Sequence, residues 1–284
     1  MASVYPTIAR WNGADNLAEK YHSFSPYHYA GNNPISNIDL DGNEFTEDAW
    51  KYVNRLVSEI NSRQDRNNDK IKSKQAELAE GGLSSRQERR LNRQIDRLED
   101  NNQELEGIRG EIATLEASDQ IYNVVESSSQ NENGPIPGLD TKVTHTSFNF
   151  DSGNVDITIS SNAGLGMFAH ELLHAYQFET GQISLGDASS PVGYSFLLDK
   201  TDELAGYTRQ GLFGSNQGVT STSTLPERYS SLPSGPVNIH NLSPSVSSAI
   251  QLKNSMFLKQ LAKQRNQAFR INGKTYSPKQ LDYA

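Results

Sequence analysis

The chain has 284 residues, enough for one large domain or two small ones, and 35% of them are hydrophobic. Its 26 Lys and Arg against 34 Asp and Glu give a formal charge of −8, which disfavours nucleic acid as a partner because basic side chains dominate that affinity. Cysteine is absent, which excludes disulfides, a cysteine nucleophile and thiolate metal ligands. No apolar run approaches the roughly 18 residues of a membrane span, and Met1 to Pro6 lack the features of a signal peptide.

Residues 1–45 are rich in aromatic residues, asparagine and glycine, and they show little hydrophobic periodicity. Turn-forming pairs close the segment, where Asp41-Gly42 is followed by Asn43. We therefore expect a loop-rich stretch with one or two short strands. So short a segment cannot bury its own aromatic side chains, and it needs a partner surface.

Residues 46–118 are predicted to form a helical hairpin. Thr46 is a suitable N-cap before two acidic residues, and Gly81-Gly82 interrupts the helical pattern. A capping box is expected over Ser85–Glu88, and the polar stretch Asn61–Lys70 is expected to be solvated. Apolar residues then recur close to a heptad spacing, at Leu91, Ile95, Leu98, Leu105, Ile108, Ile112 and Leu115.

This hairpin has two interpretations. Its helices can pack on each other or on the rest of the chain, as amphipathic helices joined by a short turn ordinarily do. Alternatively, the apolar seam, which polar Asn102 interrupts, can pair with another chain as a coiled coil. The sequence favours the first interpretation and leaves the second open.

The remaining residues, 119–284, mix strand and helix patterns, so the fold class expected is α+β. The predicted strands cover 121–126, 143–150 and 155–160, and the predicted helices cover about 164–179, 200–212 and 244–268. Gly181 is expected just beyond the first of these helices, and 214–245 is expected to be a long loop. Asn272-Gly273 predicts a type I′ turn in a closing hairpin over 269–276.

The residues that carry chemistry lie in the run His170-Glu171-Leu172-Leu173-His174. Side chains four residues apart lie on one face of a helix, with Cβ atoms about 5–6 Å apart, so both imidazoles can reach one metal ion. Glu171 would border that ion without ligating it, where it can hold a water molecule and take its proton. The alternative is a solvated helix with two surface histidines. Met167 and Phe178 flank the histidines on their own face, which favours a helix sandwiched between other elements.

A catalytic zinc ion needs a third protein ligand and an open position. A third histidine six residues after His174 is excluded because that residue is Thr180. Glu203, near the start of the predicted helix at 200–212, is the preferred ligand, although an acid there can also simply interact with the helix dipole. The sequence leaves three other carboxylates open as ligands, those of Asp187, Asp199 and Asp202.

Other polar residues can join the site. Tyr207 lies one helical turn after the preferred glutamate, where its phenol can donate to a developing oxyanion, and plain packing explains it equally well. His145 in a predicted strand and His240 after a loop are further candidates, although such histidines more often have a structural role. His22 and His28 belong to the N-terminal segment and are not expected to bind metal.

The combination of His170–His174 with Glu203 on a later helix resembles the gluzincin metallopeptidases. The tract 202–210, DELAGYTRQ, is similar to the pattern DE-x-x-A-Y-x-R-Q at the third ligand of bacterial effector-type zincins, with Gly206 in place of an alanine. The resemblance implies an active-site helix packed under a small mixed sheet, followed by a mainly helical part. It also implies Zn²⁺ as the cofactor, and an extended substrate that pairs with 155–160 as an edge strand.

The N-terminal segment resembles the end of the core of RHS repeat-associated proteins. The tracts that carry this resemblance are 15–21, 25–35 and 38–43 (DNLAEKY, SPYHYAGNNPI and IDLDGN), in which Asn16 and Leu40 replace two prolines of the family pattern. The family's core is a β-cage that encloses a C-terminal toxin and is often cleaved just after this motif. The resemblance implies a late fragment or short module of a polymorphic bacterial toxin.

These observations predict three parts, an RHS-core remnant over 1–45, a helical hairpin over 46–118 and a zincin-like metallopeptidase domain over 119–284. The function expected is that of a zinc-dependent endopeptidase, secreted or delivered into a target cell, with a protein or peptide substrate. An immunity protein or a delivery protein is a further expected partner. Two alternatives stay open, a catalytically silent module that binds through its hairpin, and a toxin of another chemistry.

Overall fold

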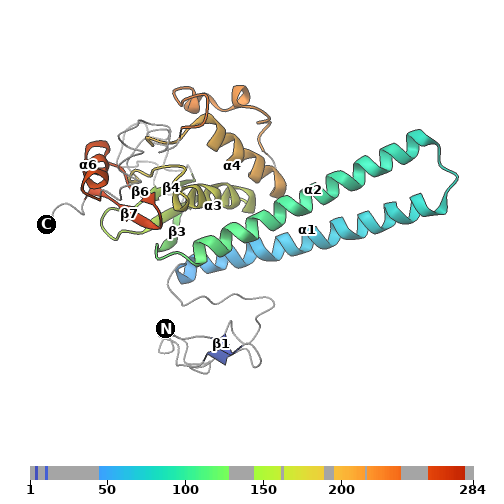
Figure 1. Ribbon diagram of the computed structural model, residues 1–284, viewed down its shortest axis with the longest axis horizontal. Helices are drawn as coiled ribbons and strands as arrows, with labels where there is room; N and C mark the ends of the chain where they lie inside the picture. The colour runs from blue at the N-terminus through green and yellow to red at the C-terminus, as the bar shows by residue number, and fades with distance from the viewer. Residues whose placement is uncertain are drawn as a thin grey trace.

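The computed structural model describes residues 4–5, 10–11, 45–127, 144–160, 163–188, 195–214, 216–237 and 255–278 (Figure 1). The tracts that resemble an RHS core, between residues 15 and 43, lie outside the described residues, as do His22, His28 and His240. Of the described helices, none is long and apolar enough to cross a membrane.

Two long helices form the predicted hairpin, α1 (Glu47–Glu80) and α2 (Ser85–Glu116), and they lie side by side as an arm (Figure 1). Thr46 caps α1 as predicted, because its hydroxyl accepts from the Ala49 N–H at 3.4 Å. Gly81 and Gly82 make the turn with φ of 74° and 76°, a conformation that favours glycine. The predicted capping box is wrong by one residue. Ser84 is the N-cap, and its N–H donates to Gln87 Oε1 at 2.9 Å.

A polar layer crosses the middle of the arm. Asn67 is 8% exposed, and its side-chain amide donates to Asn101 Oδ1 and Asn102 Oδ1, each at 2.9 Å. The expectation that 61–70 is wholly solvated is therefore wrong at Asn67. Its hydrogen-bond partners lie in the other helix, 34 and 35 residues away in sequence, where periodicity within one helix cannot reveal them. Such a layer fixes the register of two helices at a cost in stability.

A three-stranded mixed sheet lies beside the root of the arm, in the order β3 (Tyr122–Ser127), β5 (Val155–Ser160) and β4 (His145–Phe148). Strand β5 pairs in parallel with β3 and antiparallel with β4, so it is the central strand. The expectation that 155–160 is the edge strand is therefore wrong. Its alternating burial shows one face against the core, and a central strand of a small sheet shares this pattern with an edge strand. The described outer edges belong to β3 and β4.

The root of the arm and the sheet share one hydrophobic core. Val53, Leu56 and Ile60 of α1 lie in the same buried cluster as Leu105 and Ile108 of α2, Ile157 of the sheet and Phe168 of the next helix. Each of these side chains is at most 1% exposed. The base of the hairpin therefore backs the sheet, whereas its far half does not reach this core.

Helix α3 (Leu165–Glu179) follows the sheet, and α4 (Lys200–Phe213) packs against it (Figure 1). Both helices lie within one residue of their predicted bounds, and Gly181 follows α3 with φ of 74°, as predicted. The other described elements are η3 (Thr222–Thr224), η4 (Glu227–Tyr229), α6 (Ser255–Arg265), β6 (Phe269–Ile271), β7 (Lys274–Tyr276), and the paired β1 (Val4–Tyr5) and β2 (Arg10–Trp11).

The C-terminal hairpin β6–β7 turns at Asn272 and Gly273, with φ of 51° and 71°, as the Asn-Gly pair predicts. It is attached to α3 by a buried ion pair, in which Arg270 Nε lies 2.7 Å from Glu179 Oε2. The Tyr122 hydroxyl donates to the same carboxylate oxygen. This network joins the start of β3, the end of α3 and β6, and so it holds the C-terminal end of α3 in place.

Candidate metal centre

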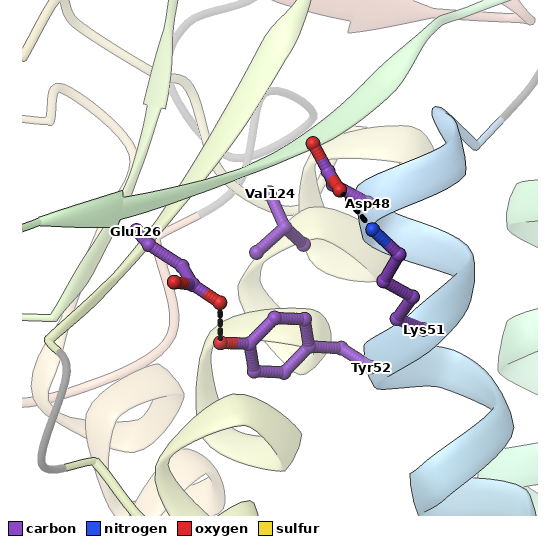
Figure 2. A pocket seen from close by; sticks show the side chains of 5 residues that line it. All are labelled: Asp48, Lys51, Tyr52, Val124 and Glu126. Carbon is purple, nitrogen blue, oxygen red and sulfur yellow. Dashed lines mark hydrogen bonds and ion pairs between the residues drawn. The ribbon is translucent and has the colours of Figure 1, made fainter.

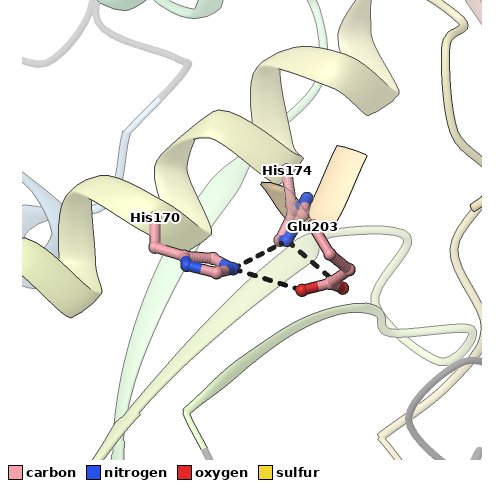
Figure 3. Close-up of side chains that lie close together, drawn as sticks. All are labelled: His170, His174 and Glu203. Atoms are coloured by element: carbon pink, nitrogen blue, oxygen red, sulfur yellow. Dashed lines mark hydrogen bonds and ion pairs between the residues drawn. The ribbon is translucent and has the colours of Figure 1, made fainter. Parts of the chain in front are cut away.

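Two helices bring three potential metal ligands together (Figure 3). His170 and His174 lie one turn apart on α3, and Glu203 lies in the first turn of α4, which packs across them. The two Nε2 atoms are 3.1 Å apart, and the Glu203 carboxylate oxygens lie 3.5 Å from His170 Nε2 and 3.7 Å from His174 Nε2. All three residues are buried, with at most 7% of each exposed. The sequence prediction of His170, His174 and Glu203 as one group is therefore matched by their position.

The spacing of these atoms fits a metal ion. Ligand atoms about 2.0–2.1 Å from a tetrahedral ion lie about 3.3–3.4 Å from one another, and the three measured separations bracket that value. His174 Nδ1 lies 2.8 Å from Gln177 Oε1, an oxygen that can only accept, so the proton of a neutral His174 is on Nδ1. The Nε2 lone pair of His174 therefore points into the group, which is what a metal ligand requires.

A second polar chain supports this arrangement. Gln177 accepts from His174 and donates from Nε2 to Asp202 Oδ1 at 2.9 Å, and Asp202 Oδ2 accepts from the Asp199 N–H. Burial raises the pKa of Asp202 to about 6. Partners of this kind fix the orientation and tautomer of a metal-ligating histidine. Asp199 and Asp202 thus hold the start of α4 and the Gln177 side chain that contacts His174, and neither is in the group of three.

Charge complementarity is strong within the group. Burial by itself would lower the pKa of His170 and raise the pKa of Glu203. The opposite charges outweigh burial, because Glu203 and Glu171 raise the pKa of His170, and His174 and His170 lower the pKa of Glu203. The imidazole of His170 therefore holds a proton more tightly than that of an ordinary histidine. A metal ion at this group would have to displace this proton, so its binding would weaken as the pH falls.

Gly206 lies directly against the ring of His170. A Cβ atom at position 206 would stand 2.5 Å from His170 Nε2 and 2.7 Å from Cε1, distances that real Cβ atoms do not adopt. The sequence singled out Gly206 only as a difference from the alanine of the gluzincin-like pattern. In the structure this glycine bears on the placement of His170, because the missing side chain leaves the space that the imidazole occupies.

Glu171 lies beside the two histidines and is 4% exposed. The hydroxyl of Thr146, on β4, lies 3.0 Å from Glu171 Oε2 and 2.9 Å from the Glu171 backbone oxygen. A hydroxyl has a single proton, so Thr146 donates to one of these oxygens at a time. This contact joins the edge strand to the carboxylate that sequence reasoning selected as the general base. Sequence reasoning missed Thr146, because a threonine in a strand carries no signal of its own.

A pair of tyrosines and an arginine border the group on the other side. The ring of Tyr207 stands edge-on to His170, with centroids 5.0 Å apart, and its hydroxyl accepts from Arg228 at 2.9 Å. Tyr229, on η4, helps to lower the pKa of the Glu203 carboxyl, and burial raises the pKa of Tyr229 itself. Sequence reasoning included Tyr207 and missed Arg228 and Tyr229. Only the adjacency of a cation and a phenol in the segment predicted as loop could have drawn attention to them.

The other carboxylates and the histidine that the sequence left open as ligands are not members of the group of three. Asp187, Asp199 and Asp202 are all described, and none of them belongs to it. Asp199 caps α4, where its carboxylate accepts from the Thr201 N–H at 2.6 Å. His145 lies on β4, and it too is outside the group.

A surface hollow of about 290 Å³ lies elsewhere, between the start of α1 and β3 (Figure 2). Both acids that line it already have partners, since Asp48 pairs with Lys51 at 2.7 Å and Glu126 accepts from the Tyr52 hydroxyl at 2.7 Å. Burial, followed by the Glu126 carboxylate, raises the pKa of Tyr52 to about 12. This hollow is part of the contact between the arm and the sheet, and it holds none of the histidines of the metal group.

Comparison with known proteins gives no match. No protein-family model, no curated protein and no solved structure is detectably similar to this chain. The function of the site therefore has to be argued from its own geometry and chemistry. That geometry is two imidazoles and a carboxylate in reach of one cation, with a second carboxylate beside them.

Proposed function

We propose that the chain is a zinc-dependent endopeptidase. The observation that carries the proposal is the convergence of His170, His174 and Glu203 from two helices, with Glu171 one residue after the first histidine. A hydrolase of this kind needs three protein ligands, an open position and a general base beside the metal. In this proposal the three convergent residues are the ligands and Glu171 is the base, and all four are buried, where charges interact strongly.

The donor set favours zinc among the common metal ions. Two imidazole nitrogens and one carboxylate oxygen suit a borderline ion, whereas calcium and magnesium prefer oxygen ligands throughout. Zinc held by these three residues would supply Lewis acidity, which polarises a peptide carbonyl and makes a water molecule more acidic.

Glu171 would perform the proton transfers. Its carboxylate takes a proton from the attacking water and returns it to the leaving amine when the peptide C–N bond breaks. One oxygen, Oε2, lies within 3.0 Å of the Thr146 hydroxyl. A donor on that oxygen fixes the carboxylate plane and leaves the other oxygen for the water. Thr146 is therefore a positioning residue for the base.

Tyr207, Tyr229 and Arg228 would act on the carbonyl oxygen of the substrate. A phenol or a guanidinium placed where negative charge develops lowers the barrier, and the effect is large in a buried site. Tyr229 interacts electrostatically with the Glu203 carboxyl, and its hydroxyl would donate to a substrate oxygen bound there. Arg228 holds the Tyr207 hydroxyl at 2.9 Å and so orients the second phenol.

An extended peptide would bind along the outer edge of β4, in place of the β5 edge that the sequence suggested. The Phe148 N–H donates to the Gly186 oxygen at 2.8 Å, away from β5. Backbone groups alternate in direction along an antiparallel strand, so those of Thr146, two residues earlier, point the same way. Substrate backbone at this edge would pair beside the residue that holds Glu171. Pairing of this kind selects extended peptides with little regard to sequence.

The resemblance to an RHS core extends the proposal to the setting of the enzyme. Under this part of the proposal the chain is the late part of a polymorphic bacterial toxin, released into a target cell, with a cognate immunity protein. The tracts 15–21, 25–35 and 38–43 carry this argument on their sequence alone.

Hydrolysis can be tested on a complex mixture of peptides. The zinc-loaded full chain is incubated with peptides from a denatured bacterial proteome, and new N-termini are identified by mass spectrometry. We expect new termini with the wild type and none above background after a chelator removes the metal. Wild-type protein that holds one zinc and yields no new termini from this mixture, or from folded protein extracts, would contradict the proposal.

Replacing Thr146 by valine tests its role in positioning the base. Valine keeps the branched shape that suits a strand and removes only the hydroxyl. We expect about a 10- to 100-fold loss of kcat with unchanged zinc content, because partners of this kind contribute that much to activity. Thr146→Ser keeps the hydroxyl and is expected to recover most of the rate. Equal losses in both variants would show that Thr146 matters only for packing.

A further inference from the structure

The outward side of α2 carries a straight row of exposed arginines. The other four arginines follow the first one by three, four, seven and eleven residues. In an α-helix this spacing places all five within an arc of about 100°, over about 16 Å of the helix length. The buried residues of this part of α2, Leu91 and Ile95, lie on the opposite side. The row, called the arginine stripe below, consists of Arg86, Arg89, Arg90, Arg93 and Arg97.

No acidic side chain pairs with the stripe within the part of the chain that the structure describes. Arg93 Nε donates to the Arg89 backbone oxygen at 3.1 Å, and this bond does not neutralise the charge of Arg93. Several arginines elsewhere in the described residues have carboxylate partners, such as Arg63 with Glu59 at 2.7 Å and Arg209 with Glu111 at 2.6 Å. Among the described residues, these five arginines form the longest run of neighbouring cations without a carboxylate partner.

The far half of the arm buries few apolar side chains that could stabilise it. Beyond Asn67 the only buried apolar side chains of the hairpin before Leu105 are Ile71, Leu91 and Ile95. Ordering each residue of such an arm costs conformational entropy, and few buried contacts are present to offset this cost. Asn67 also fixes the register between the helices, so the arm presents the stripe in one defined orientation.

The root of the arm is tied to the helix that carries Glu203. Glu111 of α2 makes a two-pronged ion pair with Arg209 of α4, with both N–O distances at 2.6–2.7 Å. At 1.5 Å per residue, the stripe begins about 21 Å and ends about 38 Å from Glu111 along α2. A molecule held on the stripe would therefore stay at a set distance from the metal group.

We propose that the arginine stripe is a docking site for an acidic segment of a partner protein. Arginine forks match carboxylates in geometry, and five of them in a row match acids repeated along a helix or an extended segment. The stretch from Arg86 to Arg97 has a charge of +3, from five arginines and two acids, which leaves −11 for the rest of a chain whose total is −8. A short acidic segment of a partner can therefore bind this local positive charge without lying close to the negatively charged rest of the chain.

Two other polyanions fit less well. A nucleic acid strand would find no ring on the arm to stack on, because no aromatic residue occurs between Tyr52 and Tyr122. A lipid surface would find no apolar anchor, because the exposed large hydrophobic residues of the described chain, Ile121, Val125 and Met256, lie outside the arm. The inference stands without the proposed peptidase function.

The test measures binding of a fluorescein-labelled peptide of about 20 glutamates to the full chain by anisotropy. A variant with glutamine at all five positions of the stripe is compared with a control that loses five cations elsewhere. We expect at least a tenfold weaker affinity for the stripe variant and less than a twofold change for the control. Binding to the wild type should also fall steeply from about 50 to about 500 mM salt. The control positions are Lys51, Arg55, Arg66, Lys259 and Lys263.

The proposal would be overturned if the wild type did not bind the peptide at low salt, or if both variants lost the same affinity for it. It would also be overturned if a single-stranded oligonucleotide or phosphatidylserine vesicles bound more tightly than the peptide through the same arginines. Circular dichroism confirms that both variants are helical. If the glutamine variant does not fold, five lysines replace the arginines, which keeps the charge and removes the forks. That chain should bind more weakly than the wild type and remain sensitive to salt.

Discussion

Replacing Glu171 by glutamine is expected to remove hydrolysis and leave the metal bound. Glutamine keeps the size of the side chain and its contact with Thr146, and it cannot take a proton from water. General base catalysis typically contributes about 10²- to 10⁴-fold, so the loss of kcat should be at least 100-fold. Glu171 is not among the three residues whose ligand atoms converge, so zinc content should stay at the wild-type value. Peptide hydrolysis and elemental analysis on the same preparation check both parts.

Asp187→Asn is a suitable control for this experiment, because it removes a carboxylate that lies outside the group of three. It is expected to keep both metal and activity. A Glu171→Gln protein with near wild-type kcat would refute the assignment of the base. A Glu171→Gln protein that loses its zinc would instead show that Glu171 acts as a ligand.

The second large effect is expected from adding one methyl group at Gly206. The Cβ of Gly206→Ala would lie 2.5 Å from His170 Nε2, so the imidazole or α4 has to move. Either movement separates His170 from Glu203, which belong to different helices. We expect a 10- to 100-fold loss of zinc affinity, the range seen when the support of a metal ligand is disturbed. Competition with a fluorescent chelator measures it.

Gly110→Ala is the matched control. Gly110 also lies inside a helix, α2, and a Cβ there meets no atom within 4 Å. It should leave zinc affinity unchanged and raise the free energy of unfolding by up to about 1 kcal/mol, because alanine is the better helix former. If Gly206→Ala binds zinc as tightly as the wild type and unfolds at the same denaturant concentration, His170 does not depend on the space beside Gly206.

Much of the group of three residues, His170, His174 and Glu203, could be predicted from the sequence, because the patterns that indicate it are local. His170 and His174 are four residues apart, and helical geometry alone places such residues on one face. Met167 and Phe178 correctly indicated that this helix is covered on both sides, since the face with the histidines is buried. Glu203 was predicted from its position near a helix start and from the resemblance of residues 202–210 to the gluzincin-like pattern. In the structure α4 brings it next to the two histidines.

The residues that sequence reasoning missed all act through tertiary contacts. Thr146 reaches Glu171 across 25 residues of sequence, and Arg228 reaches Tyr207 across 21. Neither distance has a periodicity that can be read along the chain. Tyr229 lies on a short 3₁₀ helix within a segment whose composition indicated only a loop. Side chains at such positions are recognised once the packing of α4 is known.

Strand order was the wrong prediction with the greatest consequence. The alternation of Val155, Ile157 and Ile159 correctly predicted a half-buried strand, and nothing in it distinguishes a strand with one neighbour from a strand with two. The pairing depends on β3, which is parallel to β5 and separated from it by β4 in the sequence. The error moved the proposed substrate edge from β5 to β4, next to Thr146.

The most direct test of the metal centre is the zinc content of the purified wild type and of Glu203→Ala, measured side by side by elemental analysis. Both proteins are first incubated with zinc and desalted, and circular dichroism confirms that both are folded. We expect about one zinc per wild-type chain and little in the variant, because a catalytic site of this kind requires three protein ligands. A folded wild type without zinc, or a variant that keeps a full equivalent, would contradict this expectation.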